Sequence, residues 1–325
     1  MESRNSVYLF IMGLLLLAFT TQAQYAPAVG QSGSTAVSKD SIIILGWATQ
    51  CTVSRGWQNI SDQSLGKTTE GNQNSALGIA DNNVVSLGDG GTAVLQFAQA
   101  IRNGPGPDFA VFENAFDDLF LELAFVEVSS DGLNYFRFPA HSLTQTSTQV
   151  STFGQLQTTQ INNLAGKYRG GYGTPFDLEE LKNTVGLDVM SITHIRIVDV
   201  VGSINDAYAR FDTANNKIND PFPTPFPSGG FDLDAVAVMH ITTGVVNSVK
   251  ENQIKIYPNP SNGLLFINAK EDSDIELISI QGNLMISKMI YRGISKLDIR
   301  VLAKGVYFLR LENKHGVHIR RIVKN

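Results

Sequence analysis

The chain has 325 residues, of which 43% are hydrophobic and 17% charged, and its formal net charge is −5. This mixture is too apolar for a disordered protein and too polar on average for a membrane protein. Because Cys51 is the single cysteine, an intramolecular disulfide and a metal site built only of cysteines are excluded.

The charge is divided unevenly along the chain. Residues 24–249 contain 11 Lys and Arg against 22 Asp and Glu, a net of −11, whereas residues 250–325 contain 13 against 7, a net of +6. Such a change within one chain indicates two modules. The acidic part would repel the phosphates of a nucleic acid, so we expect no nucleic-acid partner, and it favours cations.

The first 23 residues are predicted to be a signal peptide. Residues 7–19 form an apolar run of 13 residues after Arg4, and a helix that spans a bilayer needs about 20. Small residues at Thr21 and Ala23 suit cleavage after Ala23. We therefore expect export to the periplasm and a mature chain without a membrane span; the alternative is a buried helix.

Residues 24–246 are predicted to form an all-β domain, joined by a linker at 247–253 to the last module. Short apolar or alternating runs are separated by Gly, Pro, Asn and Asp, which is typical of strands and turns. The expected strands are 41–47, 83–87, 93–97, 108–112, 122–129, 133–138, 194–201 and 235–241. Residues 176–183, after a proline, are the one good short helix. Many short strands favour a β-sandwich of the jelly-roll kind.

The same region resembles a poorly characterised family of secreted bacterial surface proteins. The resemblance lies in blocks such as VVSLGDGGTAVLQF, NGPGPDFAVFENAF and GGFDLDAV, and it covers most of residues 30–241. It implies a jelly roll like those of carbohydrate-binding modules. It brings no biochemical activity with it.

Carboxylates and amides recur where the expected strands end. We predict a calcium site that draws on Asp108, Glu113, Asn114, Asp232 and Asp234, because calcium takes six to eight oxygen ligands. Asp232 and Asp234 would share one face of a strand, since side chains alternate. The alternative is that these residues are solvated turn residues.

A ligand site is predicted in the glycine-rich segment 167–173. Its candidate residues are Tyr168, Arg169 and Tyr172, because sugars stack on aromatic rings and a guanidinium can bond their hydroxyls. The alternative is that the rings are core or loop anchors. Catalysis would need a pair of carboxylates, for which Asp108 with Glu113, or Glu122 with Glu127, are the candidates.

Residues 254–325 carry the most specific motifs. They include the turn YPNP at 257–260, a strand pair around IQGN, the run LAKGVYFLRL and a basic tail that ends in IVKN. In order and spacing they resemble the type A C-terminal sorting domain of the type IX secretion system. The resemblance implies a small immunoglobulin-like β-sandwich that binds the secretion machinery and directs the protein to the cell surface or the medium. The alternative is an ordinary immunoglobulin-like adhesion module.

Together these observations predict an exported protein of two β domains. The expected function is a non-catalytic module that binds a glycan or another ligand, with calcium in its fold. The alternatives are an extracellular hydrolase or lyase that acts on polysaccharide, and a purely structural surface protein.

Overall fold

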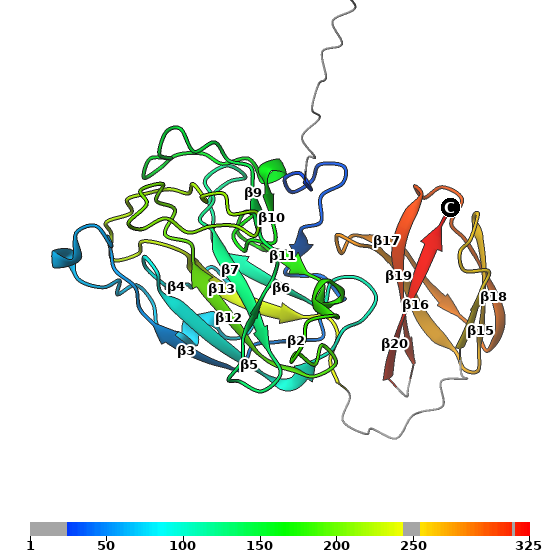
Figure 1. Cartoon of the computed structure of the whole chain (residues 1–325). Coiled ribbons are helices and arrows are strands. Elements are labelled where there is room, and N and C mark those ends of the chain that lie inside the picture. The colour runs from blue at the N-terminus through cyan, green and yellow to red at the C-terminus, as the bar shows by residue number, and fades with distance from the viewer. Residues whose placement is uncertain (1–24, 243–253, 314–315) are drawn as a thin grey trace, which may run out of the picture.

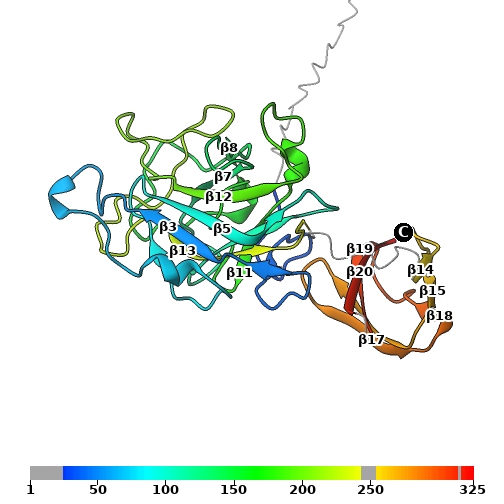
Figure 2. The same ribbon diagram turned by 90° about the horizontal axis from the view of Figure 1, so that it is seen from below.

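The computed structural model of the chain describes residues 25–242, 254–313 and 316–325. The predicted signal peptide and the predicted linker lie outside the described residues. Two β domains lie side by side in both views, the larger one before residue 243 and the smaller one after residue 253 (Figures 1 and 2).

One sheet of the larger domain has six antiparallel strands. Its order is β1-β11-β6-β13-β2, and β4 also pairs with β13. The strands are β1 (Val37–Ser38), β2 (Gly46–Trp47), β4 (Val85–Ser86), β6 (Phe109–Glu113), β11 (Tyr172–Phe176) and β13 (Asp232–Val238).

The second sheet has five antiparallel strands in the order β3-β5-β12-β7-β8. They are β3 (Gln50–Ser54), β5 (Thr92–Ile101), β7 (Ala124–Ser129), β8 (Phe136–Arg137) and β12 (Ile192–Asp199). Side chains of both sheets, such as Val111 and Val126, meet in one core, which also holds Cys51. Burial in this core raises the pKa of the Cys51 thiol to about 12. The two packed sheets confirm the predicted all-β sandwich.

The inner strands β6 and β13 are apolar on both faces. Phe109 and Val111 of β6 point into the core between the sheets, whereas Ala110 and Phe112 belong to a second cluster on the other face. The Trp47 ring covers Phe112 there, with the ring centroids 5.4 Å apart. Burial on both faces explains why this strand reads as an unbroken apolar run rather than an alternating one.

Four predicted elements are much shorter in the structure. The strands expected at 83–87 and 133–138 are the two-residue β4 and β8. Of residues 41–47 only β2 is a strand, because the Ile44 N–H donates to the Ser41 carbonyl in a turn at 3.1 Å. The apolar residues before β2 instead cover the second cluster. The helix expected at 176–183 is a single 3-10 turn, η4 (Leu178–Leu181), capped by the Asp177 side chain.

Long loops cover the outer face of β7. Leu123 and Phe125 pack there against loop residues such as Leu156, Ile161 and Ile218. Short elements stiffen the loops of the larger domain: β9 (His141–Ser142), β10 (Ile161–Asn162), η1 (Gln63–Leu65), η2 (Gln73–Ala76) and η3 (Thr158–Gln160). The loops therefore pack as a third layer with an apolar core of its own.

The smaller domain is a second β-sandwich. Its sheets have the orders β14-β15-β18 and β17-β16-β19-β20, and Leu265, Ile275 and Leu309 lie in the core that they share. The strands are β14 (Ile254–Tyr257), β15 (Leu264–Ala269), β16 (Ser273–Ser279), β17 (Leu284–Ile290), β18 (Gly293–Asp298), β19 (Gly305–Asn313) and β20 (Gly316–Lys324).

The two domains touch at a small number of points. Gln281 Nε2 donates to the Ser34 carbonyl at 3.1 Å, and Phe308 packs against the second cluster of the larger domain. Within the ranges that the structure describes, no helix has the length and apolar character needed to cross a bilayer.

Candidate functional site

Four phenylalanine rings from three loops form a row on the larger domain, which we call the phenylalanine row (Phe116, Phe120, Phe153 and Phe226). Successive ring centroids are 5.4, 6.1 and 5.9 Å apart, and the first and last pairs are stacked. Phe116 is 82% exposed, Phe153 71% and Phe226 39%. Exposed apolar side chains in contact with one another mark a binding surface, whereas single ones are common on any protein.

A buried amide, Asn219, holds the loop that leads to Phe153. Its Oδ1 accepts the Val150 N–H at 2.9 Å, and its Nδ2 donates to the carbonyls of Gln145 and Thr148 at 2.6 and 2.8 Å. Asn219 is completely buried. These bonds replace strand pairing for a segment that has none, so one side chain fixes the loop.

The next residue, Asp220, fixes the loop of Phe116 and Phe120. Its Oδ2 accepts the Leu123 N–H at 2.7 Å. Its Oδ1 is buried and has no hydrogen-bond partner among the described residues. A buried acceptor without a partner is costly, and this atom is therefore a candidate ligand for a proton or a cation.

Two further bonds join the three loops directly. The Leu156 N–H donates to the Leu119 carbonyl at 2.8 Å, and the Thr152 hydroxyl donates to the Pro223 carbonyl at 2.8 Å. The first links the loops of Phe120 and Phe153, and the second links those of Phe153 and Phe226. The row is consequently held as one unit rather than by three independent loops.

A polar cavity of about 360 Å³ adjoins the row at Phe116. We call it the amide–carboxylate cavity, after its polar lining of Glu70, Ser75, Asn82, Asn83, Asn114, Ser228 and Asp232. Its size lies at the lower end of the range for small-molecule sites. No lysine or arginine is among the residues that line it, so its charged groups are hydrogen-bond acceptors.

Buried polar side chains fix the walls of this cavity. Asp234 accepts the backbone N–H groups of Asp81 and Asn82 at 3.1 and 3.2 Å, which sets the loop that carries Asn82. The Arg55 guanidinium donates to the Gly71 carbonyl at 2.7 Å and to two other carbonyls. Arg55 is thus bound to the backbone, and its charge acts on Glu70 and Asp232, two residues of the cavity lining.

The three residues predicted as ligand contacts have different surroundings. Tyr168 is fully buried and its hydroxyl bonds Thr35 Oγ1 at 2.9 Å, so the prediction is wrong for this ring, which is an anchor. Arg169 forms an ion pair with Asp118 at 2.6 Å, on the loop of the phenylalanine row. The guanidinium lies 5.3 Å from the centroid of the partly exposed Tyr172 ring. Arg169 therefore borders the loop of the row, whereas Tyr172 lines a separate cavity of about 700 Å³ together with residues 29–40 and 281–284.

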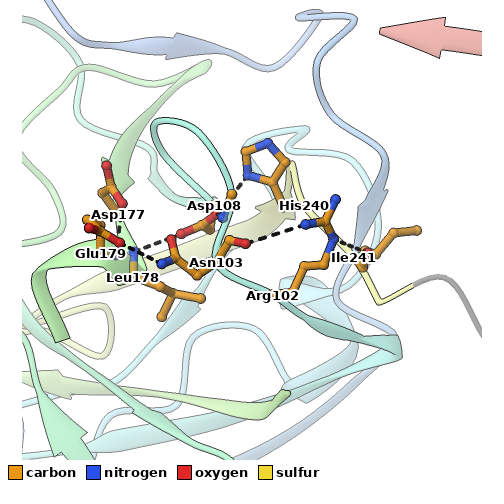
Figure 3. Close-up of polar contacts among 9 residues, drawn as sticks. Arg102, Asn103, Asp108, Asp177, Leu178, Glu179, His240 and Ile241 are labelled. Atoms are coloured by element: carbon orange, nitrogen blue, oxygen red, sulfur yellow. Dashed lines mark hydrogen bonds and ion pairs between the residues drawn. The ribbon is translucent and has the colours of Figure 1, made fainter. Parts of the chain in front are cut away.

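Asp108 does not join the other predicted calcium ligands. Its Oδ1 accepts the Gly104 N–H at 2.8 Å and lies 2.7 Å from His240 Nδ1, while Oδ2 accepts the Leu178 N–H at 2.8 Å (Figure 3). It is completely buried. Asp108 precedes β6 and Glu113 ends it, so the two are roughly 16 Å apart at about 3.3 Å per residue. Asp108 is a structural link among three segments, and its pairing with Glu113 as a catalytic dyad is wrong on distance.

Three of the other predicted ligands come together, and one does not. Asn114 and Asp232 line the amide–carboxylate cavity, and the charge of Asp232 acts on Glu113. Asp234 instead holds the backbone of Asp81 and Asn82. Among the residues that the structure describes, no three His, Cys, Asp or Glu side chains are arranged to hold a metal ion. A calcium ion at all five residues together does not fit this arrangement.

Five buried acids and the half-buried Asp232 of the cavity lining form a group that we call the acid cluster (Asp89, Glu113, Glu122, Asp199, Asp220 and Asp232). Burial raises the pKa of Glu113, Glu122 and Asp220 well above the usual range, and mutual repulsion adds to it. Burial also raises the pKa of Asp199 to about 6, of Asp232 to about 7 and of Asp89 to about 8. These acids favour bound protons or a nearby cation.

Hydrogen bonds to Asp199 limit the rise of its pKa. Three backbone N–H groups, from Gly90, Val201 and Phe231, donate to its carboxylate at 2.8 to 2.9 Å. They stabilise the charged form, so its pKa rises less than burial alone would dictate. The bonds also tie the turn after β4 to the segment after β12 and to the residue before β13.

The second candidate catalytic pair is also not supported. Arg137 lies 2.8 Å from Glu127 Oε1 and Arg196 lies 2.5 Å from its Oε2, so both oxygens are engaged by cations. Glu122 belongs to the acid cluster instead, where the charges of Asp232 and Glu113 act on it. The two carboxyl groups face different surroundings.

Comparison with known proteins identifies the smaller domain. Residues 255–325 match the family model described as a secretion system C-terminal sorting domain. This part of the chain is thus a type IX secretion sorting domain, and it marks the protein for the cell surface or the medium. None of the curated proteins matches the sequence.

Solved structures similar to the chain include a β-glucuronidase of Ruminococcus gnavus. One match has 11% identity and a TM-score of 0.18, and covers 72% of this chain and 35% of that one. The complex with D-glucaro 1,5-lactone has 10% identity and a TM-score of 0.19, and the match covers 88% of this chain and 47% of that one. The complex with uronic isofagomine has 10% identity and a TM-score of 0.23, and the match covers 92% of this chain and 46% of that one. This chain spans about a third to a half of the enzyme's length, and at these TM-scores the likeness carries no argument.

The acid cluster generates a prediction about pH. A carboxyl group with a raised pKa in the folded state stabilises the fold below its unfolded pKa of about 4, and this stabilisation is lost as the pH rises through the folded value. In chelator, the melting temperature should therefore fall by roughly 5 °C or more between pH 5 and pH 9. Differential scanning calorimetry at several pH values measures this fall in melting temperature.

Asp232→Asn is the matched variant, because the amide oxygen can still accept the Ser86 hydroxyl. This variant should weaken the dependence of the melting temperature on pH. Asp40→Asn, a substitution at an exposed position, should leave that dependence unchanged. A melting temperature that rises from pH 5 to pH 9 would contradict the assignment of these acids as protonated.

Proposed function

We propose that this exported protein is a non-catalytic module that binds a glycan chain along the phenylalanine row, with one sugar residue in the amide–carboxylate cavity. The observation that carries the proposal is the exposed row of rings directly beside a polar cavity. Phe116 belongs to both, so the two surfaces form one site.

The chemistry of the two surfaces suits a sugar. A pyranose ring has an apolar face of C–H groups, which stacks on aromatic rings, and hydroxyls around its edge, which need hydrogen-bond partners. The row supplies the first, and the carboxylates and amides of Glu70, Asn82, Asn114 and Asp232 supply the second. Because the loops are cross-linked by hydrogen bonds, the site loses little conformational entropy when it binds.

The alternative is a hydrolase or lyase that acts on polysaccharide, and a structural surface protein is a third possibility. The exposed rings favour binding over a purely structural role. Release of new reducing or unsaturated ends, measured on the same glycans that are tested for binding, distinguishes an enzyme from a binding module.

The double variant Phe116→Ala and Phe153→Ala tests the site. It removes the two most exposed rings of the row, and we expect at least a tenfold loss of glycan affinity, since loss of a binding hot spot costs about 2 kcal/mol or more. The measurement is affinity electrophoresis of the wild-type protein against neutral, amino-sugar and uronate polysaccharides, followed by calorimetry on the best ligand.

Phe211→Ala is the control, because Phe211 is an exposed phenylalanine without a ring contact to the row. It should bind like the wild type, and the melting temperature of the double variant should stay within a few degrees. Retention of full affinity by the double variant, or the absence of binding to every polysaccharide, would refute the proposal.

We also propose a calcium ion beside the cavity, bound by a smaller set of residues than the sequence suggests. Asn114 and Asp232 line the cavity, and the charge of Asp232 acts on the buried Glu113. Side-chain oxygens of these three residues would bind the ion, and backbone oxygens would complete the ligands. The raised pKa values of Glu113 and Asp232 support this, because a cation relieves the repulsion between the two carboxylates.

Removal of calcium tests this part separately. A ligand that binds only the folded state, at a concentration a hundred times its Kd, adds about 2.7 kcal/mol to the free energy of unfolding. A chelator should therefore lower the melting temperature at pH 7.5 by several degrees. Glu113→Gln should abolish the difference and Asp108→Asn should keep it. Identical melts with chelator and with millimolar calcium would reject the ion.

A further inference from the structure

One strand of the sorting domain has an open edge. Within the part of the chain that the structure describes, β17 pairs with β16 on one side and with no strand on the other. In an antiparallel sheet alternate residues direct their N–H and C=O groups to opposite sides, so an outer strand leaves half of these groups unpaired. Among the described residues, no backbone bond outside the sheet reaches residues 284–290.

The side chains at this edge are apolar and exposed. Met285 is 42% exposed, Met289 51% and the adjacent Tyr291 68%. Leu284 is exposed as well, and it borders the cavity that the smaller domain forms with residues 29–40 of the larger one. We call these four residues the β17 edge. Exposed strands normally carry charges or prolines that prevent pairing with another chain, whereas β17 has Lys288 as its single charge.

The opposite edge of the same sheet, β20, is closed over its last residues. Asn259 Nδ2 donates to the Arg321 carbonyl at 2.7 Å and its Oδ1 accepts the Val323 N–H at 2.8 Å. The Ser261 N–H also donates to the Val323 carbonyl, at 2.8 Å. The turn at YPNP thus covers the end of β20, residues 321–324, whereas no bond of this kind reaches β17 within the described ranges.

The edges of the other sheet are protected by length and charge. β14 has four residues and is followed at once by Pro258. β18 exposes Lys296 and Asp298. Of the four outer strands of the domain, β17 combines seven residues, apolar side chains and an unpaired backbone.

We propose that the β17 edge is the docking surface of the sorting domain, and that an extended segment of the type IX secretion machinery adds to β17 as a further strand. A sorting domain must be recognised by that machinery, so a partner exists. Strand addition takes its affinity from backbone hydrogen bonds and its specificity from alternate side chains. Methionine adapts to varied partner surfaces, and the cations Lys288 and Arg292 beside the edge suit a partner strand with carboxylates.

The test is export of the full chain in a bacterium that has the secretion system. Met285→Lys with Met289→Lys places two charges on the edge, and we expect at least a tenfold fall in the fraction at the surface or in the medium, with the protein retained in the periplasm. Met285→Leu with Met289→Leu, and Val301→Lys at an exposed turn of the same domain, should be exported like the wild type.

Purified protein and crosslinking complete the design. The lysine double variant should have the melting temperature of the wild type. If it does not fold, a photoreactive residue placed at Met289 tests the proposal instead. That residue should crosslink to a component of the secretion machinery, whereas the same residue at Val301 should not. Normal export of the folded lysine variant, equal crosslinking at both positions, or crosslinking only to a second copy of this chain overturns the proposal.

Discussion

The candidate site depends on two adjacent buried residues, Asn219 and Asp220. No regular element spans the three loops of the phenylalanine row at the positions of the rings, so backbone groups there cannot be satisfied by sheet pairing. Asn219 satisfies three of them around residues 145–150, and Asp220 satisfies one at Leu123. An exposed aromatic surface can be preorganised in this way although it lies on loops.

Burial of the inner strands has an electrostatic consequence. Because β6 and β13 are covered on both faces, Glu113 at the end of β6 is drawn out of water together with Asp220, and Asp232 at the start of β13 is half-buried beside them. Their charged forms are unfavourable there unless a proton, a backbone N–H or a cation compensates. The proposed calcium ion, the pH dependence and the acceptor-rich cavity all follow from this arrangement.

The sequence predicts most strands and the sorting domain, because alternation and turn residues are local signals, and residues 255–325 carry many motifs in fixed order. It does not predict contacts between distant loops. Tyr168 reads as exposed because glycines surround it, yet Thr35 covers it. The phenylalanine row is not predicted because its rings come from three separate loops. A lone phenylalanine in a polar loop, as at Phe116 and Phe153, is the signal that points to it.

The most direct test of this account is amide hydrogen exchange of Asn219→Ala, measured with glycan affinity on the same sample. If Asn219 positions the phenylalanine row, exchange should quicken around residues 145–156, exchange in β6 and β13 should stay as slow as in the wild type, and affinity should fall. Unchanged exchange in this loop, or faster exchange spread evenly over both sheets, would contradict it.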